Sequence, residues 1–290
     1  MNTNSTSAPI NRRTKGFYRL YFLMILFLSQ PAMAQVEGIR DRFLNNNELM
    51  VAAHRAAHQK YPENSLKSIE EAIRLGVDLV ELDIRVTRDG LPILMHDDSI
   101  DRTTNGSGLV EELTYEKINS FYLLYNGEPG SEKVPTLEEA FRVCKGRIMV
   151  DMDMKTDQVE AVVEVVKAMG ITDHLLFFDS DWKVLQNIKQ QLPRAYLMPR
   201  AYKTKHIKKA YKKLRPEAIH IDQGFYTPKT IKQANKYGMR IWINSLGDRD
   251  RQISSSPEPQ KDLQWIQQGA NMVQTDFPEY WLSIQSKMNK

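Results

Sequence analysis

Residues 50–85 read MVAAHRAAHQKYPENSLKSIEEAIRLGVDLVELDIR and contain the unit from which the fold can be predicted. Two β-rich runs, Met50 to Arg55 and Leu79 to Arg85, flank an amphipathic helical run from Ser65 to Leu75. A strand, a helix and a strand in this order are typical of parallel strands joined by a crossover helix. The stretch therefore predicts an α/β fold.

The same alternation continues to the end of the chain. Further strands are predicted at Arg147 to Asp153, Leu175 to Asp179, Arg194 to Met198, Ala218 to Asp222, Arg240 to Asn244 and Met272 to Thr275. Helices are predicted between them, at Gln158 to Met169, Lys183 to Gln191 and Pro228 to Tyr237. Eight strands, with polar residues repeatedly at their carboxyl ends, favour a (β/α)8 TIM barrel. A doubly wound open sheet is the alternative.

A hairpin and an insertion are expected after the second strand. Asp89 and Gly90 are a two-residue turn signal, so residues 91–95 should double back along that strand. Without a bulge, Arg88 opposes Leu91, which brings His96 to about the level of Asp83. Residues 97–135 are long for a connection between barrel elements and predict a small insertion over the mouth of the pocket.

The N-terminus has the pattern of a secretory signal peptide. Four basic residues between positions 12 and 19 precede the apolar run 20–28, and Ala32-Met33-Ala34 follows it. A membrane anchor is the alternative, but a bilayer span needs about 20 apolar residues. We therefore expect residues 1–34 to be removed and residues 35–290 to form one domain. The product should be exported to the periplasm or the extracellular space, with no stable membrane anchor.

The charge balance changes once the leader is set aside. Four of the 40 Lys and Arg residues, and none of the 36 Asp and Glu residues, lie in residues 1–34, which leaves 36 of each sign. The sequence pI of about 8.9 thus reflects the leader, and no nucleic-acid partner is expected. The densest basic run, Lys203 to Arg215, has helical spacing and is interpreted as a solvated helix face. Weak contact with acidic membrane headgroups is the alternative.

Cys144 is the single cysteine, so an intramolecular disulfide is excluded and the stability of the domain must come from its core. The cysteine follows the apolar-periodic segment Leu137 to Val143. We expect it to be a small buried hydrophobic residue and not a nucleophile.

Carboxylates recur at a spacing of two on two of the predicted strands. Glu81 and Asp83 must point to the same face, as must Asp151 and Asp153. Ionised carboxylates in one pocket repel each other and any phosphate, unless protons or a cation neutralise them. A hard divalent ion such as Ca²⁺ or Mg²⁺ would do so. A solvated strand face is the alternative, but His54 and His96 in the same region favour a functional site.

Six segments together resemble the glycerophosphodiester phosphodiesterase family, whose domain is the phospholipase-C-like phosphodiesterase barrel. They are AHRAAHQKYPENS (53–65), VELDIRVTRDGLPILMHDDSIDRTTNGSG (80–108), KVPTLEEAF (133–141), MVDMDMK (149–155), RIWINS (240–245) and VQTDFP (273–278). The resemblance covers nearly all of the chain after the leader.

The resemblance also implies roles for individual residues. It implies that one divalent metal ion binds Glu81, Asp83 and Asp153. It implies that His54 and His96 are the acid-base pair, that Arg55 and Lys155 contact phosphate, and that Trp242 lines the substrate pocket. Two positions depart from the family pattern. Ala56 replaces the usual glycine, and Asp153 stands where glutamate is more usual.

These residues suit phosphodiester hydrolysis. A phosphodiester repels hydroxide and has a poor leaving group, so a metal ion, a base and an acid all assist the reaction. The resemblance implies a small-molecule glycerophosphodiester substrate that yields sn-glycerol 3-phosphate and an alcohol, with His54 as base and His96 as acid. The nucleophile is water or the glycerol hydroxyl of the substrate. A phosphodiesterase of lysolipids or cyclic diesters, and a non-catalytic binding barrel, are the alternative functions.

Other polar residues carry weaker signals. His58 is expected to be solvated in a loop, with a place in the pocket as the alternative. Glu63 and Asn64 could shape the pocket, while Asn64 or Ser65 could cap the helix that follows. The other histidines, His174, His206 and His220, are interpreted as structural or exposed.

Overall fold

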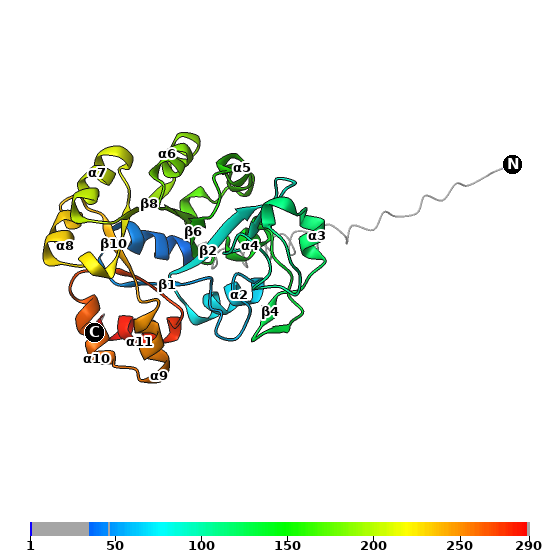
Figure 1. Ribbon diagram of the computed structural model, residues 1–290. Coiled ribbons are helices and arrows are strands. Elements are labelled where there is room, and N and C mark those ends of the chain that lie inside the picture. The colour runs from blue at the N-terminus through cyan, green and yellow to red at the C-terminus, as the bar shows by residue number, and fades with distance from the viewer. Residues whose placement is uncertain (2–34, 46, 289–290) are drawn as a thin grey trace.

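The computed structural model of the protein describes Met1, residues 35–45 and residues 47–288. Apart from Met1, the predicted signal peptide lies outside these residues. The described chain forms a closed barrel of parallel strands with helices around it, the (β/α)8 TIM barrel that the sequence predicts (Figure 1). No helix in the described ranges is long and apolar enough to cross a membrane.

Eight parallel strands form the barrel wall. They are β1 (Met50–Ala53), β2 (Leu79–Val86), β6 (Met149–Met154), β7 (Leu175–Asp179), β8 (Tyr196–Ala201), β9 (Ala218–Ile221), β10 (Arg240–Asn244) and β11 (Met272–Thr275). Each strand pairs with the next in this order, and β1 pairs with both β2 and β11, which closes the barrel. All eight predicted strands are present.

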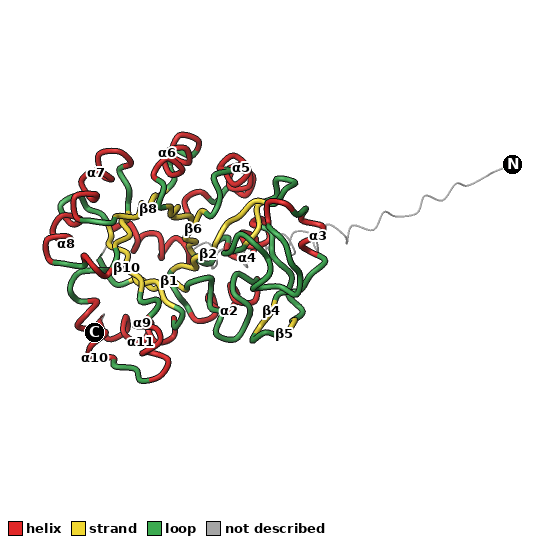
Figure 2. Tube along the Cα trace, viewed as in Figure 1, coloured by secondary structure: helices red, strands yellow, loops and turns green. Residues whose placement is uncertain are grey.

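The helices that follow the barrel strands lie outside the ring of strands (Figure 2). They are α2 (Leu66–Leu75), α4 (Leu137–Cys144), α5 (Val159–Met169), α6 (Trp182–Gln191), α7 (Thr204–Leu214), α8 (Pro228–Asn235), α9 (Asp248–Ser255), α10 (Pro259–Ile266) and α11 (Pro278–Met288). Their apolar faces and the outward side chains of the strands form the largest buried cluster. Cys144 is buried in this cluster, and burial raises the pKa of its thiol to about 12, as expected for a packing residue.

One end of the barrel, which we call the floor, is apolar. Its inward side chains include Met50, Leu79, Met149 and Met272 at the start of their strands. A helix formed by residues 35–45 lies across this end and packs Val36, Ile39 and Phe43 against them. This helix is the blue element inside the ring in Figure 1. The sequence analysis did not predict it.

The hairpin after β2 is present, but its predicted register is wrong by one residue. Strand β3 (Pro92–Leu94) pairs with β2 so that Ile84 lies opposite Leu94. The Thr87 amide donates to the carbonyl of Leu91, and Gly90 has a φ of 81°. Three residues therefore form the loop, with a left-handed glycine at its end, in place of the two-residue turn. As a result Asp83 lies opposite Met95, and the Met95 amide donates to the backbone carbonyl of Asp83. His96 follows one residue after this pair.

Residues 97–135 form an insertion with its own small core. The insertion contains the helices η1 (Val110–Glu112) and α3 (Tyr115–Asn119) and the strands β4 (Leu124–Tyr125) and β5 (Glu128–Pro129). Ile100, Val110 and Ile118 pack with Ile93 and Met95 of the hairpin. The insertion thus extends the β2–β3 hairpin as a separate hydrophobic cluster.

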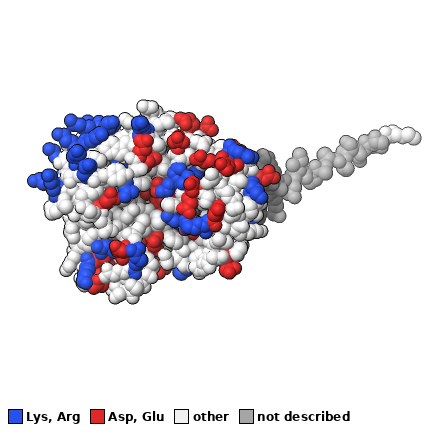
Figure 3. Space-filling model, in the orientation of Figure 1, with Lys and Arg blue, Asp and Glu red and all other residues white. Residues whose placement is uncertain are grey.

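The basic run forms α7, an amphipathic helix. Its buried residues Ile207, Ala210 and Leu214 face the barrel, and its lysines are exposed. Lysine and arginine side chains gather over α7 and α8 at one side of the molecule (Figure 3). The predicted helical spacing of the basic run is therefore confirmed, and its lysines lie on the exposed side of the helix.

Candidate active site

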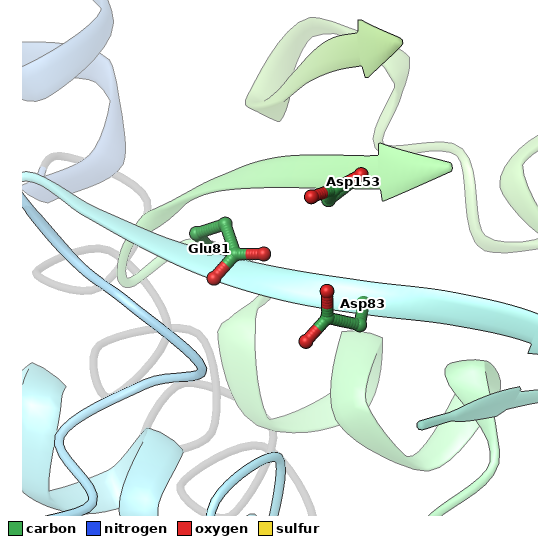
Figure 4. A group of neighbouring side chains, drawn as sticks. All are labelled: Glu81, Asp83 and Asp153. Carbon is green, nitrogen blue, oxygen red and sulfur yellow. The ribbon is translucent and has the colours of Figure 1, made fainter. Parts of the chain in front are cut away.

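Three carboxylates meet at the other end of the barrel, which we call the mouth. Glu81 and Asp83 lie on β2, and Asp153 lies on β6 directly beside Asp83 in the register of the two strands. One carboxylate oxygen of each lies within 4.8 Å of the others, and the side chains point toward one another (Figure 4). The spacing of two along parallel strands brings the three groups together because it keeps them on the inner face.

Burial makes this cluster electrostatically unfavourable without a cation. Burial, and then repulsion from Asp83, Asp153 and Asp151, raises the pKa of Glu81 well above its usual value. Burial also raises the pKa of Asp153. Glu81 Oε1 and Asp83 Oδ1 are buried without a hydrogen-bond partner, which costs free energy. Oxygen ligands of this kind, with free lone pairs aimed at one point, fit a hard divalent cation.

Two basic side chains lie against the carboxylates. Lys155 Nζ is 2.6 Å from Asp153 Oδ2 and 3.3 Å from Asp83 Oδ1. Burial lowers the pKa of Lys155, but the neighbouring carboxylates outweigh it and the pKa is raised overall. Arg55 Nε lies 3.5 Å from Asp83 Oδ2. Lys155 therefore remains charged beside the acidic cluster, and the Arg55 side chain lies against the same cluster.

The backbone after β1 takes an unusual conformation at the site. The strand ends at Ala53, earlier than predicted, because Arg55 and Ala56 have left-handed φ values of 48° and 62°. This turn directs the Arg55 amide to Glu81 Oε2 at 2.7 Å. A left-handed residue other than glycine costs about 1 kcal/mol. Ala56 therefore adopts the backbone that the family's usual glycine would adopt without this cost.

The two open interpretations of Asn64 and Ser65 are separated by the structure. Ser65 is the N-cap of α2, and its hydroxyl accepts from the Ser68 amide. Asn64 instead contacts Asp83, donating from Nδ2 to Oδ2 at 2.8 Å and accepting from the Asp83 amide. Asn64 thus holds the Asp83 side chain in place, and Ser65 caps the helix.

Each of the two predicted acid-base histidines is paired with an aspartate. His54 Nδ1 is 2.7 Å from Asp276 Oδ1, and His96 Nδ1 is 2.6 Å from Asp97 Oδ1. Burial raises the pKa of Asp276, but the hydrogen bond from His54 and the positive charges around the carboxylate together outweigh burial, and the pKa is lowered overall. A carboxylate at Nδ1 fixes the ring and leaves Nε2 for proton transfer. The sequence analysis assigned no role to Asp276 or Asp97.

His58 lies at the edge of the site, so the expectation of a solvated loop residue is wrong. Its Nδ1 donates to the carbonyl of His54 at 2.9 Å, and its Nε2 lies 3.6 Å from Asp276 Oδ1. The side chain is only 22% exposed. Two histidines therefore share one aspartate where β1 and β11 meet.

An ion-pair chain links the insertion to the barrel. Arg102 donates to both Glu63 and Asp97, and Glu63 also accepts from Arg55. The hydrogen bond from Arg102 is the main reason why the pKa of Asp97 is strongly lowered. The insertion thus contacts His96 through Asp97 and Arg55 through Glu63.

A cavity of about 220 Å³ lies beside the carboxylates. His54, Asp153 and Lys155 line one side of it, and Trp242 lines it as the resemblance implies. The cavity is also lined by polar side chains that the sequence analysis did not place in the site, among them Asp179 on β7, next to β6, and Arg200 and His220 on β8 and β9. Burial raises the pKa of Asp179 to about 6 and lowers that of His220 to about 3, so the imidazole is neutral.

Comparisons with known proteins agree with this geometry. Residues 54–279 match the family described as the glycerophosphoryl diester phosphodiesterase family. A glycerophosphodiester phosphodiesterase of Caldanaerobacter subterraneus subsp. tengcongensis is 24% identical over 252 residues, which cover 82% of this chain and 98% of that protein. Human glycerophosphodiester phosphodiesterase 1 is 40% identical over 134 residues, or 43% of this chain, and the match spans 38% of the human protein.

A solved structure shares both the fold and part of the sequence. A phosphodiesterase of Oleispira antarctica, solved in complex with the product sn-glycerol-3-phosphate, superimposes with a TM-score of 0.72. It is 25% identical, and the match covers 84% of this chain and 98% of the other. The family match spans both histidines, all three carboxylates and the strand that carries Trp242. The chain therefore belongs to the glycerophosphoryl diester phosphodiesterase family and is an enzyme of that family.

Proposed function

We propose that the protein is a metal-dependent phosphodiesterase that hydrolyses glycerophosphodiesters to sn-glycerol 3-phosphate and an alcohol. In this proposal His54 and His96 are the general base and the general acid. Glu81, Asp83 and Asp153 bind one divalent ion, Ca²⁺ or Mg²⁺. Arg55 and Lys155 bind the phosphate, and Trp242 lines the pocket for the organic part of the substrate.

The observation that carries the proposal is the meeting of three carboxylates, two of them buried, with the side chains of Lys155 and Arg55. The carboxylate oxygens lie within 4.8 Å of one another, and two of the oxygens lack a hydrogen-bond partner. A divalent ion in this place would supply positive charge to a non-bridging phosphate oxygen. Lys155 and Arg55 would compensate further charge on the same phosphate, and Arg55 can do so with a planar fork.

The two histidine–aspartate pairs support acid-base catalysis. Each aspartate accepts from Nδ1, so that each histidine can hold or release a proton at Nε2. His54 lines the cavity and is buried more deeply than His96. In the proposal, His54 takes the proton from the nucleophile, and His96 gives a proton to the oxygen of the leaving alcohol.

The proposed compartment follows from the leader. With residues 1–34 removed, the enzyme would work in the periplasm or outside the cell, with no stable membrane anchor and no nucleic-acid partner. Detection of a protein that begins at Gln35 in an exported fraction, with the leader present only in a secretion-blocked strain, would support this compartment.

A substrate panel tests the function directly. We expect the purified protein to release sn-glycerol 3-phosphate from glycerophosphocholine or a related glycerophosphodiester, to stop when a chelator is added, and to recover with Ca²⁺ or Mg²⁺. The Asp83→Asn variant should require a much higher metal concentration. Hydrolysis that is indifferent to chelator would contradict the metal site. Faster hydrolysis of lysolipids or cyclic diesters would instead favour the alternative substrates.

The Asp276→Asn variant tests the positioning of His54. Asparagine keeps the shape of the side chain but offers an amide where His54 needs an acceptor of fixed charge, so we expect kcat to fall at least about tenfold with KM little changed. The ionisation that governs the acidic limb of the pH–rate profile should move to lower pH, because the imidazolium loses its partner. A purely structural role would leave that limb in place.

A further inference from the structure

The charges of the chain are divided between two parts of the barrel. Residues 182–244, from the start of α6 to the end of β10, contain 15 Lys and Arg residues and only two Asp and Glu residues. The rest of residues 35–290 contains 21 Lys and Arg residues and 34 Asp and Glu residues. A protein that is neutral after loss of its leader therefore carries a strongly positive side and a negative side.

The positive side is presented by two neighbouring helices. Their exposed lysines, which we call the basic face, are Lys205, Lys208, Lys209, Lys212 and Lys213 on α7, and Lys229 and Lys232 on α8, with Lys236 at its C-cap. Within residues 47–288, no ion pair is formed by any of them, whereas lysines elsewhere pair with Glu71, Glu132 and Glu258. Figure 3 shows this concentration of positive side chains over α7 and α8. The basic face thus has no acidic partner within the described chain.

Amphipathic rings lie beside the basic face, at the end of α7 nearest to the mouth. Tyr202 is 52% exposed. The centroid of its ring lies 6.3 Å from that of the His206 ring, and the centroid of the Trp182 ring lies 6.0 Å from it. Lys209 Nζ lies 5.7 Å from the Trp182 ring. Aromatic rings next to lysines are suited to the boundary between water and lipid, because the ring can enter the headgroup region while the ammonium group stays in water.

We propose that the basic face, with Tyr202 and Trp182, docks the enzyme on a membrane surface rich in anionic phospholipids. Helices α7 and α8 flank β8, β9 and β10, which form the wall of the cavity that contains Arg200, His220 and Trp242. Docking would therefore hold the mouth next to a lipid surface. This location matters if the proposed function holds, because glycerophosphodiesters are what phospholipids leave when both acyl chains are hydrolysed.

A membrane fits the basic face better than a nucleic acid does. The lysines lie along the outer surface of two helices that pack side by side, with Tyr211 and Tyr237 stacked between them. The surface offers mainly lysines, which act as point charges; the one exposed arginine at the end of α7, Arg215, lies over the Tyr211 ring at 4.2 Å. Attraction of this kind is independent of sequence and is screened by salt.

Vesicle binding tests the proposal with the whole purified protein. We expect sedimentation with vesicles of phosphatidylglycerol and phosphatidylcholine at low salt, and none with phosphatidylcholine alone. A lysine near an anionic surface contributes about fivefold in binding. The double variant Lys208→Gln/Lys212→Gln should therefore bind about 30-fold more weakly, and added salt should release the wild-type protein.

The control variant is Lys167→Gln/Lys287→Gln, which removes two exposed helical lysines outside the basic face. It should bind the vesicles like wild type. Equal loss in both double variants, or no binding at low salt, would overturn the proposal. Duplex DNA that competes as well as vesicles would assign the basic face to polyanions in general and overturn it too.

Hydrolysis of a soluble glycerophosphodiester separates this proposal from the proposed function. Neither double variant should change that rate, because the substituted lysines lie on outer helices away from the cavity. An active protein that ignores vesicles would contradict membrane docking alone. A protein that binds vesicles without hydrolysing any glycerophosphodiester would contradict the function alone.

Discussion

The floor and the mouth of the barrel are built from the same strands and have opposite energetics. Strands β2 and β6 begin with Leu79 and Met149, which are buried against the helix of residues 35–45. The same strands continue to Glu81, Asp83 and Asp153, whose buried charges repel one another. Burial of apolar area stabilises the fold at the floor, while burial of charge costs stability at the mouth. Stability and function are thus separated along the barrel axis.

The largest effect should come from removing a histidine at the mouth. We expect His54→Ala or His96→Ala to lower kcat by at least about 100-fold, because general acid-base catalysis contributes about 100- to 10,000-fold. Metal affinity and thermal stability should change little, since neither histidine belongs to the carboxylate group. Steady-state kinetics and metal titration measure both. Near-normal turnover by either variant would contradict the assignment of catalysis to the histidines at the mouth.

A floor substitution should do the reverse. Met149 is fully buried beside the helix of residues 35–45, so Met149→Ala should lower the free energy of unfolding by about 2–4 kcal/mol. Activity at low temperature should stay within about twofold. Denaturant unfolding provides the measurement, with Met169→Ala at the half-buried end of α5 as the milder comparison. A loss of activity that exceeds the loss of folded protein would show that floor and mouth are coupled.

A buried acid at the mouth should cost stability in a pH-dependent way. Burial raises the pKa of Asp179 to about 6, against about 4 in an unfolded chain. The folded protein therefore binds the extra proton between pH 4 and 6, and wild-type stability falls as the pH rises through that window. Asp179→Asn should escape this loss and be about 1–2 kcal/mol more stable than wild type above pH 6, in the presence of chelator.

Parallel denaturant titrations of the two proteins across this pH range measure that difference. The advantage of Asp179→Asn should be small near pH 4 and constant above pH 6. An advantage that is the same at every pH would mean that the charge of Asp179 is not its cause.

The smallest effect is expected at Ala56. Glycine would relieve the left-handed strain by about 1 kcal/mol but would remove a buried methyl group of similar value. We expect Ala56→Gly to change the free energy of unfolding by less than about 1 kcal/mol and to leave kcat nearly unchanged. A large loss of activity would show that the methyl group itself shapes the turn at Arg55.

Features that are local in the sequence could be predicted, and features created by closure of the barrel could not. The strands and the Glu81–Asp83 spacing follow from short runs of residues. Asp276 is 222 positions from His54, and nothing near either residue indicates their contact. Arg200 was missed because strand β8 was predicted to end at Met198, before Pro199, a residue type that usually interrupts a strand. His220 is buried against Phe178, which agrees with its interpretation as a structural residue, but its place in the cavity lining could not be predicted because the contacting side chains are on other strands.

The hairpin shows how a small backbone choice limits such predictions. Asp89-Gly90 fits a two-residue turn and also the end of a three-residue loop, and the structure contains the second. The difference moves the pairing by one residue. His96 still reaches the site, because β3 ends at Leu94 and the chain bends into the insertion after it.

The pairing of β1 with β11 has a consequence for when the enzyme becomes active. His54 follows the first strand and Asp276 follows the last, so their hydrogen bond forms only after the two strands meet. A nascent polypeptide that lacks β11 has an open barrel and no Asp276 beside the His54 imidazole. Under the proposed function, hydrolysis would begin only once the final strand has paired with the first, and turnover would report completed folding.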